Sequence, residues 1–383
     1  METVKLYYED SFLAEFEAAV VSCEEKGDRW AVVLDRTAFY PEGGGQACDL
    51  GTLGDANVLD VREKGETVIH LCDRPLTVGA CVTGKLNWER RLDQMQQHSG
   101  EHIVSGLLCS RFSCHNVGFH IGADTVTIDF DAPIPADALA QIEEDANQAI
   151  WENLPFRCWY PDPEELKTIP YRSKKQLPWP VRIVDAGGYD LCACCGVHVK
   201  QTGSIGMIKL LSCVKFHQGV RIEMVCGKRA LRFLSEIYEQ NRLVSQAFSA
   251  KVLETGEAAR KTNEALAAEK FRSAGLEKQL FGMIAVSYEN AGNVVRFENL
   301  LSPAAVRDLS DAIADVCGGV AAVFSGCDEN GYTVCLCSRN DDLKQLGKEM
   351  NEALQGRGGG KPGFFQGSVR ATKAQIEAFF QNR

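Results

Sequence analysis

The sequence lacks any long apolar run. Across its 383 residues, no hydrophobic stretch approaches the roughly 18 residues that a membrane-spanning helix needs. The first ten residues, METVKLYYED, are charged and lack the apolar core of a secretory signal peptide. We therefore expect no membrane span and a cytoplasmic location.

Excess positive charge and sequence repetition are also absent. Acidic residues outnumber basic ones by 52 to 41, and the net charge of −11 argues against nonspecific coating of nucleic acid. The net charge does not exclude a local basic patch. We find no internal repeat and no low-complexity tract. The length and composition are typical of a globular protein with several domains.

Cysteine, in contrast, is plentiful. The sixteen cysteines are scattered from Cys23 to Cys337, without the density of a small disulfide scaffold. In a large chain without a signal peptide, most of them should be reduced and buried as small apolar residues. The exceptions are expected among cysteines that lie close to histidines.

The pattern along the chain predicts a multidomain α+β protein in four parts. Residues 1–88 contain short β-branched and aromatic runs broken by Gly and Asp, which favours a small β-barrel. Residues 89–227 mix helical periodicity with strand pairs, as in an α+β domain. The pattern over residues 228–280 predicts a helical arm, and the pattern over residues 281–383 predicts an α/β domain.

The C-terminal half has two local features that bear on its fold. Gly256 weakens the arm midway, so a break into two antiparallel helices is expected there. The arm either packs on its own protein or forms a coiled-coil homodimer. Its imperfect heptad pattern does not decide between the two. Near the end of the chain we expect a glycine-rich loop, Gly356–Ser368.

His98 and His102 form a spaced pair in a region with helical periodicity. An i, i+4 spacing places both rings on one face of a helix, which is a common grip on a transition metal. A metalloprotease of the HExxH type is disfavoured, because Ser99 follows the first histidine and the acid, Glu101, precedes the second. Two of only seven histidines on one helix face could also be coincidence.

The stretch LCACCGVHV, residues 191–199, offers further metal ligands. Cys194 and His198 are also four residues apart, and Gly196 between them allows a tight turn. Together with the histidine pair they make a mononuclear zinc site a good candidate. The alternative is that the cysteines are core residues beside a surface histidine.

Three consecutive glycines, Gly43 to Gly45, are the third feature. They allow another segment or a ligand to approach bare backbone N–H groups, although a flexible hairpin tip would look the same. Gln46 and Thr37 beside them carry groups that could read a small polar substituent.

These motifs occur in the order found in alanyl-tRNA editing domains. The sequence resembles the free-standing AlaX proteins and the editing half of alanyl-tRNA synthetase. The resemblance covers essentially the whole chain, because the helical arm and the C-terminal residues look like the C-Ala, or DHH-associated, domain of the long AlaX form. It rests on five segments: TAFYPEGGGQACDLG, HSGEH, CCGVHV, TGSIG and GVRIEMVCG.

The resemblance implies roles for particular residues. The zinc ligands would be His98, His102, Cys194 and His198. The GGGQ motif falls on Gly43, Gly44, Gly45 and Gln46, and Thr37 matches a threonine that helps to recognise a seryl hydroxyl. Within the CCGVH segment, Cys195 and Val197 depart from the usual CGGTH. Cys192 lies outside this segment, six residues before His198, and by this spacing is expected to pack. Glu101 stands where many members have Gln; facing the site it could orient water, and facing solvent it would do nothing.

The implied reaction is hydrolysis of the ester that joins a wrong amino acid to tRNA(Ala). Seryl ester is the expected substrate, with glycyl ester as a second one. Basic residues outnumber acidic ones from Arg339 onward, and the candidate tRNA contacts are Arg221, Arg357 and Lys361.

Three other interpretations stay open from the sequence. The chain could be part of an alanine–tRNA ligase, although it starts directly at the β unit and shows no ATP-binding motif. It could be a module that binds zinc and tRNA without catalysis. A DHH-type phosphoesterase is the third, but we find no DHH triad.

Overall fold

The computed structural model describes residues 2–173 and 177–381. Contacts between Cα atoms divide the chain into two compact units, 1–242 and 243–383. Each unit contains both β-sheet and helices, so the prediction of a multidomain α+β protein is confirmed. None of the described helices combines the length and apolarity that crossing a membrane requires. All sixteen cysteines are free thiols.

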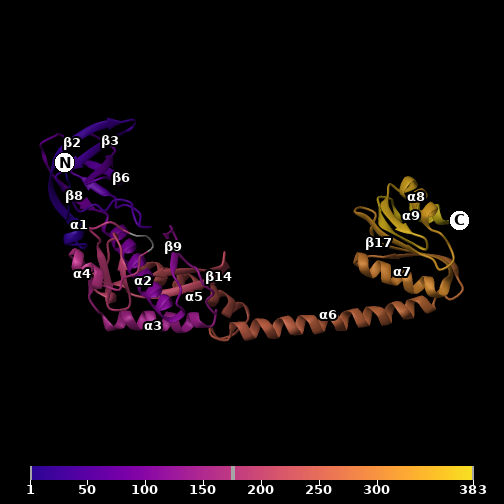
Figure 1. The fold of residues 1–383 in the computed structure, drawn as a ribbon. Helices are drawn as coiled ribbons and strands as arrows, with labels where there is room; N and C mark the ends of the chain where they lie inside the picture. The colour runs from indigo at the N-terminus through magenta and orange to yellow at the C-terminus, as the bar shows by residue number, and fades with distance from the viewer. Residues whose placement is uncertain (1, 174–176, 382–383) are drawn as a thin grey trace. The chain divides into compact units, whose positions relative to one another are not determined.

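The first unit begins with a closed barrel (Figure 1). Its strands alternate buried and exposed residues, so that one face of each fills a single apolar core. The barrel order is β2 (Glu15–Lys26), β3 (Arg29–Leu34), β7 (Thr67–Cys72), β6 (Ala56–Lys64), β5 (Gly51–Leu53) and β8 (Cys81–Leu86). Before it come β1 (Val4–Lys5) and α1 (Leu6–Glu9), and β1 pairs in parallel with β4 (Arg36–Thr37).

A long buried helix, α2 (Trp88–Phe112), follows the barrel. The Asn87 side chain caps its start by accepting the backbone N–H of Arg90 at 3.1 Å, and Ser113 ends it in the left-handed conformation. Most residues from Gln94 to Leu108 on this helix are buried, polar ones included. A helix that is buried on nearly all sides and carries histidines is therefore at the centre of this unit.

Two antiparallel sheets and one helix pack around α2, and a second, short helix of this unit has no buried residue. The larger sheet has the order β14 (Ile208–Phe216), β15 (Gly219–Cys226), β10 (Val126–Phe130) and β9 (Asn116–Ile121). The smaller one has the order β11 (Phe156–Trp159), β12 (Ile183–Ala186) and β13 (Leu191–Ala193). The helices are α3 (Ala138–Glu152) and the short α4 (Pro163–Thr168), with a 3-10 turn, η1 (Thr202–Ile205).

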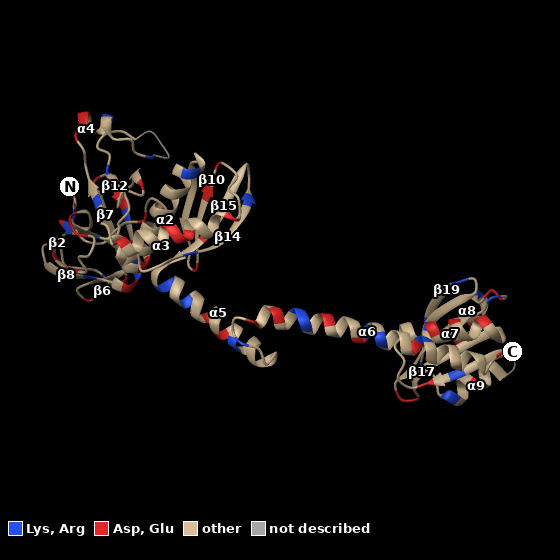
Figure 2. Ribbon diagram, turned by 90° about the horizontal axis from the view of Figure 1, so that it is seen from below, with Lys and Arg blue, Asp and Glu red and all other residues tan. Residues whose placement is uncertain are grey.

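The predicted arm consists of two helices, α5 (Gly227–Ala247) and α6 (Thr255–Val286). They are separated at residues 248–254, where Ser249 adopts a left-handed φ of 51°. The break was expected at Gly256, but this glycine lies in the first turn of α6, where helix hydrogen bonds begin rather than continue. Acidic and basic side chains alternate along α6 (Figure 2) and form i, i+3 and i, i+4 ion pairs such as Arg260–Glu264.

The second unit is a three-layer α/β domain (Figure 1). Alternate residues of one inner strand face opposite layers: Ala321 and Val323 pack with α6 and α7, and Ala322 and Phe324 with α8 and α9. The sheet order is β16 (Gly292–Glu298), β17 (Gly318–Cys327), β18 (Gly331–Cys337), β20 (Phe364–Val369) and β19 (Arg357–Lys361). Its helices are α7 (Pro303–Cys317), α8 (Lys344–Ala353) and α9 (Lys373–Gln381).

The expected glycine-rich loop, Gly356–Ser368, is wrong. These residues form the antiparallel hairpin β19–β20, and β19 is an edge strand. Glycine is needed on this strand for packing: a Cβ at Gly358 would lie 2.6 Å from the ring of Phe365. Because Gly358 has no side chain, Phe365 of β20 can lie against the edge strand.

Candidate metal centre

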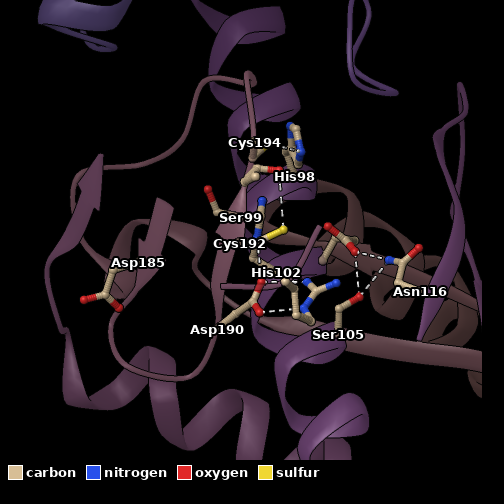
Figure 3. A network of polar contacts seen from close by, with 12 residues as sticks. His98, Ser99, His102, Ser105, Asn116, Asp185, Asp190, Cys192 and Cys194 are labelled. Atoms are coloured by element: carbon tan, nitrogen blue, oxygen red, sulfur yellow. Dashed lines mark hydrogen bonds and ion pairs between the residues drawn. The ribbon is translucent and has the colours of Figure 1, made fainter. Parts of the chain in front are cut away.

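Four of the predicted residues, His98, His102, Cys194 and His198, meet at one point in the first unit. Figure 3 shows the first three of them. His98 and His102 lie one turn apart on α2, and their rings stack with centroids 5.4 Å apart. Cys194 and His198 come from the segment that follows β13. One ligand atom from each of these residues lies within 4.8 Å of the others, so two pairs that are distant in sequence form one cluster.

The free atoms of this cluster fit a metal ion. The Nε2 atoms of His102 and His198 are buried and have no hydrogen-bond partner, whereas His98 Nε2 lies 3.4 Å from Cys194 Sγ. Buried nitrogen atoms without partners cost free energy, and a cation between them would remove that cost. Three imidazoles and one thiol are a ligand set that suits tetrahedral zinc.

The other ring nitrogen of each histidine contacts a protein group. His98 Nδ1 lies 2.8 Å from Gln46 Oε1, His102 Nδ1 lies 2.8 Å from Asp190 Oδ2, and His198 Nδ1 lies 3.4 Å from Ser99 Oγ. Metal-binding histidines typically use one nitrogen for the metal and donate the other to such a partner. The three rings are therefore oriented before any metal binds.

Burial determines the charge state of the cluster. Burial, then the neighbouring rings of His98 and His102, holds the pKa of His198 well below its usual value, so that this ring stays neutral and able to bind a metal. Burial also raises the pKa of the Cys194 thiol, so metal binding must displace a proton from it. Burial disfavours the Asp190 carboxylate, but hydrogen bonds from His102 and Arg172 outweigh it and lower its pKa to about 2.

A cavity of about 550 Å³ opens onto this cluster. His98, His102 and Cys194 contribute to its wall, together with Phe119 and Tyr160. Its size is that of pockets which enclose small molecules, and its wall is mostly apolar with a few polar groups. A bound group could therefore reach the cluster while most of its surface is removed from water.

The glycine triplet forms a tight turn beside the cluster. Gly43 and Gln46 exchange two backbone hydrogen bonds, of 3.1 and 2.9 Å. Gly44 and Gly45 have φ values of 60° and 84°, and a Cβ at Gly45 would lie 2.6 Å from the Phe119 ring. A Cβ at Gly44 would lie 3.2 Å from Cys195 Sγ. The triplet is therefore packed against the site and is not a free hairpin tip.

Gln46 and Glu101 lie close to the cluster, with their contacts already specified. Gln46 Oε1 accepts the backbone N–H of Val197 at 3.3 Å in addition to contacting His98, and Gln46 Nε2 is buried without a partner. Glu101 lines the cavity, and its Oε1 accepts Ser105 Oγ at 2.6 Å and Asn116 Nδ2 at 2.5 Å. The carboxyl group faces the interior, so the solvent-facing alternative does not apply.

Thr37 lies in the barrel with a partner of its own. Its Oγ1 is 2.8 Å from His70 Nε2 and accepts the backbone N–H of Phe39 at 3.0 Å. Burial lowers the pKa of His70 to about 4, so this ring is neutral, and its Nδ1 contacts the Val32 carbonyl. Since Nδ1 must donate there, Thr37 donates to Nε2, and one hydroxyl lone pair remains.

The three candidate tRNA contacts differ in their surroundings. Arg221 on β15 is bound to Asp129 by two hydrogen bonds of 2.7 and 2.8 Å and stacks on Phe216, so its charge is already paired. Arg357 and Lys361 lie at the two ends of the exposed edge strand β19. The strand β19 belongs to the second unit, whereas the cluster and Arg221 belong to the first.

Sequence reasoning missed the residues that support the ligands. Ser99 and Asp190 contact ring nitrogens of His198 and His102, and Arg172 contacts Asp190. Asp190 precedes Cys194 by four residues, directly after the turn Gly187–Gly188. An acid between a glycine turn and a metal-ligand motif is a usable signal, although the spacing does not show which histidine it contacts.

Replacing Cys194 and Cys192 separately should tell two metal arrangements apart. His102, Asp190 and Cys192 form a second group that could hold a metal. We expect Cys194→Ser to weaken zinc binding by more than the roughly 10–100-fold that loss of a supporting group costs, and Cys192→Ser to leave it nearly unchanged. Competition with a coloured chelator measures both. Zinc retention by Cys194→Ser together with loss in Cys192→Ser would reverse the assignment.

Two known families match parts of the chain. Residues 3–90 match the family described as tRNA synthetases class II (A). Residues 181–223, which include Cys194 and His198, match the threonyl and alanyl tRNA synthetase second additional domain. The two matches therefore cover the barrel and the segment that contributes half of the cluster.

Curated proteins extend this likeness to nearly the full length. The alanyl-tRNA editing protein Aarsd1-A of Xenopus laevis is 28% identical over 97% of this chain and 96% of its own length, and Aarsd1 of Mus musculus is 28% identical over 96% and 95%. The alanine–tRNA ligase of Pyrococcus furiosus is 36% identical over 60% of this chain but only 26% of the ligase.

One solved structure also matches part of the chain. The C-Ala domain of Aquifex aeolicus alanyl-tRNA synthetase is 18% identical, with 22% of this chain and 85% of that domain aligned and a TM-score of 0.21. The sequence relatives extend over nearly the whole chain, and both synthetase-derived segments fall within the region that they match. The chain is therefore similar over nearly its full length to alanyl-tRNA editing proteins, and over part of its length to alanine–tRNA ligase.

Proposed function

We propose that this chain is a zinc-dependent hydrolase that removes a wrong amino acid from tRNA(Ala), with serine as the preferred substrate and glycine as a second one. The observation that carries the proposal is the set of two unpartnered Nε2 atoms, a third imidazole and a thiol at the wall of a cavity. Relatives named as alanyl-tRNA editing proteins support the same reaction class.

His98, His102, Cys194 and His198 would hold the zinc ion. Bound zinc supplies a positive charge that can polarise an ester carbonyl or orient the substrate. The chain itself provides the rest: Gln46 and Asp190 orient two of the rings, and the largely apolar cavity limits access of bulk water. Glu101 lies in the cavity wall with Oε1 held by Ser105 and Asn116, where its carboxylate can accept a hydrogen bond from water.

Thr37 and Gln46 are the proposed readers of the seryl hydroxyl. Gln46 Nε2 has an unused N–H, and Thr37 has one acceptor lone pair left after bonding Phe39 and His70. A seryl hydroxyl could use both. An alanyl group could use neither, and a buried polar group left without its partner costs about 1–3 kcal/mol.

The second unit is proposed to bind the tRNA. Arg357 and Lys361 have one glycine, Gly359, between them on the same face of β19, and a Cβ there would meet no atom within 4 Å. Two cations beside bare backbone suit a phosphate chain.

A cytoplasmic location and dimerisation through the arm belong to the same proposal. The exposed apolar residues of α5, such as Leu231 and Ile237, support dimerisation.

Deacylation of Ser-, Gly- and Ala-tRNA(Ala) by the zinc-loaded chain tests the proposal. We expect seryl ester to be hydrolysed at least about tenfold faster than alanyl ester, the equivalent of about 1.4 kcal/mol. His102→Ala is the control and should be inactive, because it removes a ligand. Stable Ser-tRNA(Ala), or full activity of the control, would refute the proposal and favour a module that binds tRNA without catalysis.

A further inference from the structure

We infer that Asp190, held in place by Arg172, is a positioning residue: it fixes the His102 ring so that Nε2 faces the metal. The inference rests on the proposed metal site. It adds two residues, neither of them a ligand, on which metal affinity should depend.

The contacts of Asp190 determine the tautomer of His102. The Asp190 side chain is 2% exposed, and its Oδ2 lies 2.8 Å from His102 Nδ1 (Figure 3). An ionised carboxylate can only accept hydrogen bonds, so Nδ1 must carry the proton. The lone pair of the neutral ring is then on Nε2, the atom that is buried without a partner in the cluster.

Arg172 in turn fixes the carboxylate. Its Nε donates to Asp190 Oδ1 and its Nη2 to Oδ2, both at 2.7 Å, in the two-point geometry that restricts a carboxylate most. The backbone of Arg172 is itself bound to β13: its N–H donates to Leu191 at 2.7 Å, and its carbonyl accepts the N–H of Ala193 at 2.8 Å. Ala193 directly precedes Cys194, so one short strand locates both the thiol ligand and the pair that orients His102.

A direct bond between Asp190 and the metal is the competing interpretation. His102, Asp190 and Cys192 could hold an ion by distance alone. However, both oxygens of Asp190 already accept from Arg172, and a guanidinium beside a divalent cation is repulsive. This arrangement would also require Nδ1 of His102 to lose its proton. We therefore assign Asp190 to orientation of the ring.

The partners of the other two rings make Asp190 distinctive. His98 contacts the amide oxygen of Gln46, and His198 contacts the hydroxyl of Ser99 at a longer 3.4 Å. Neither partner carries a charge. A charge-assisted hydrogen bond is about twice as strong as a neutral one, so His102 should be the ring whose orientation depends most on its partner.

Zinc affinity of the full-length protein, measured by chelator competition, tests the inference. We expect Asp190→Ala to weaken zinc binding about 10–100-fold. Asp190→Asn should fall between this variant and the wild type, because the amide can either accept from Nδ1 or donate to it. The matched control is Asp185→Asn: Asp185 lies in the same hairpin, points away from the cluster (Figure 3) and should stay within twofold of wild type.

Two outcomes would overturn the inference. One is wild-type zinc affinity in Asp190→Ala when His102→Ala has lost its zinc. The other is equal, complete loss of zinc in Asp190→Ala, His102→Ala and Cys192→Ser, which would make Asp190 a ligand. If Asp190→Ala does not fold, Arg172→Gln serves instead and should weaken zinc about tenfold; an unchanged affinity there would likewise contradict the inference.

Long-range ¹H–¹⁵N NMR of the zinc-free wild type gives a readout that needs no variant. His102 should show its proton on Nδ1, and an Nε2–H tautomer would refute the inference. The proposed function fails separately: a chain that binds zinc yet hydrolyses no seryl ester would refute that function and leave the tautomer result standing.

Discussion

Gly196→Ala should weaken zinc binding by at least about 100-fold and reduce ester hydrolysis in proportion. A Cβ at this position would overlap His98 Cε1 and lie 2.5 Å from Nδ1, which is closer than real atoms approach. It would also lie 3.1 Å from Gln46 Oε1, the atom that orients the same ring. The new methyl group must therefore displace a ligand and its partner together, and metal sites tolerate little displacement.

Gly275→Ala is the control for this substitution. Gly275 lies within α6, where an added Cβ meets no atom within 4 Å. We expect zinc affinity and hydrolysis to match the wild type, and helix stability to rise slightly, because alanine favours helices over glycine by about 1 kcal/mol. Chelator competition and deacylation assays measure the pair. Wild-type zinc affinity in Gly196→Ala would show that the segment from Cys194 to His198 moves freely.

Arg91→Ala should destabilise the first unit by about 3–5 kcal/mol. Arg91 on α2 is fully buried, and its Nε lies 3.0 and 2.9 Å from the two oxygens of Asp49. Its Nη1 also donates to the Ser11 carbonyl at 2.9 Å, and its Nη2 to the Ala38 carbonyl at 2.5 Å. Truncation leaves a buried carboxylate without its cation and two carbonyls without a donor, so α2 loses its polar contacts with Ser11, Ala38 and Asp49.

Arg74→Ala is the matched control, because Arg74 pairs with Asp73 at the surface. Exposed pairs are screened by water, so its unfolding midpoint should stay close to that of the wild type. Thermal unfolding of the full chain, followed by calorimetry, compares the variants. We expect the transition of the first unit to fall by about 10 °C in Arg91→Ala, while that of the second unit stays in place. Equal midpoints for both variants would contradict the buried-pair interpretation.

Spacing was enough to predict the four clustered residues. His98 and His102 share a helix face by local geometry alone, and a Gly between Cys194 and His198 signals a turn. Their supporting residues could not be found in the same way. Gly106, one turn after His102, allows the 187–190 turn to lie against α2: a Cβ there would lie 2.8 Å from Asp190 Cβ. The contact depends on tertiary packing, which no short spacing encodes.

The expected glycine-rich loop shows where a local pattern misleads. The glycines of β19 indicated a loop, but strand pairing to β20 outweighs their low β-propensity because Phe365 fills the space they leave. Thr37 lies near the glycine triplet in sequence, yet its hydroxyl bonds His70, which is 33 residues away. Only the closed barrel brings His70 to it.

Gln46 links the barrel segment to His98 on α2 through a single hydrogen bond of 2.8 Å. A shift of the barrel relative to this helix would therefore also act on His98, one of the proposed metal ligands. The affinity for a metal ion and the position of the barrel relative to α2 should therefore depend on each other. If cobalt is bound at this site, its visible absorption, which depends on ligand geometry, should change when the substrate binds.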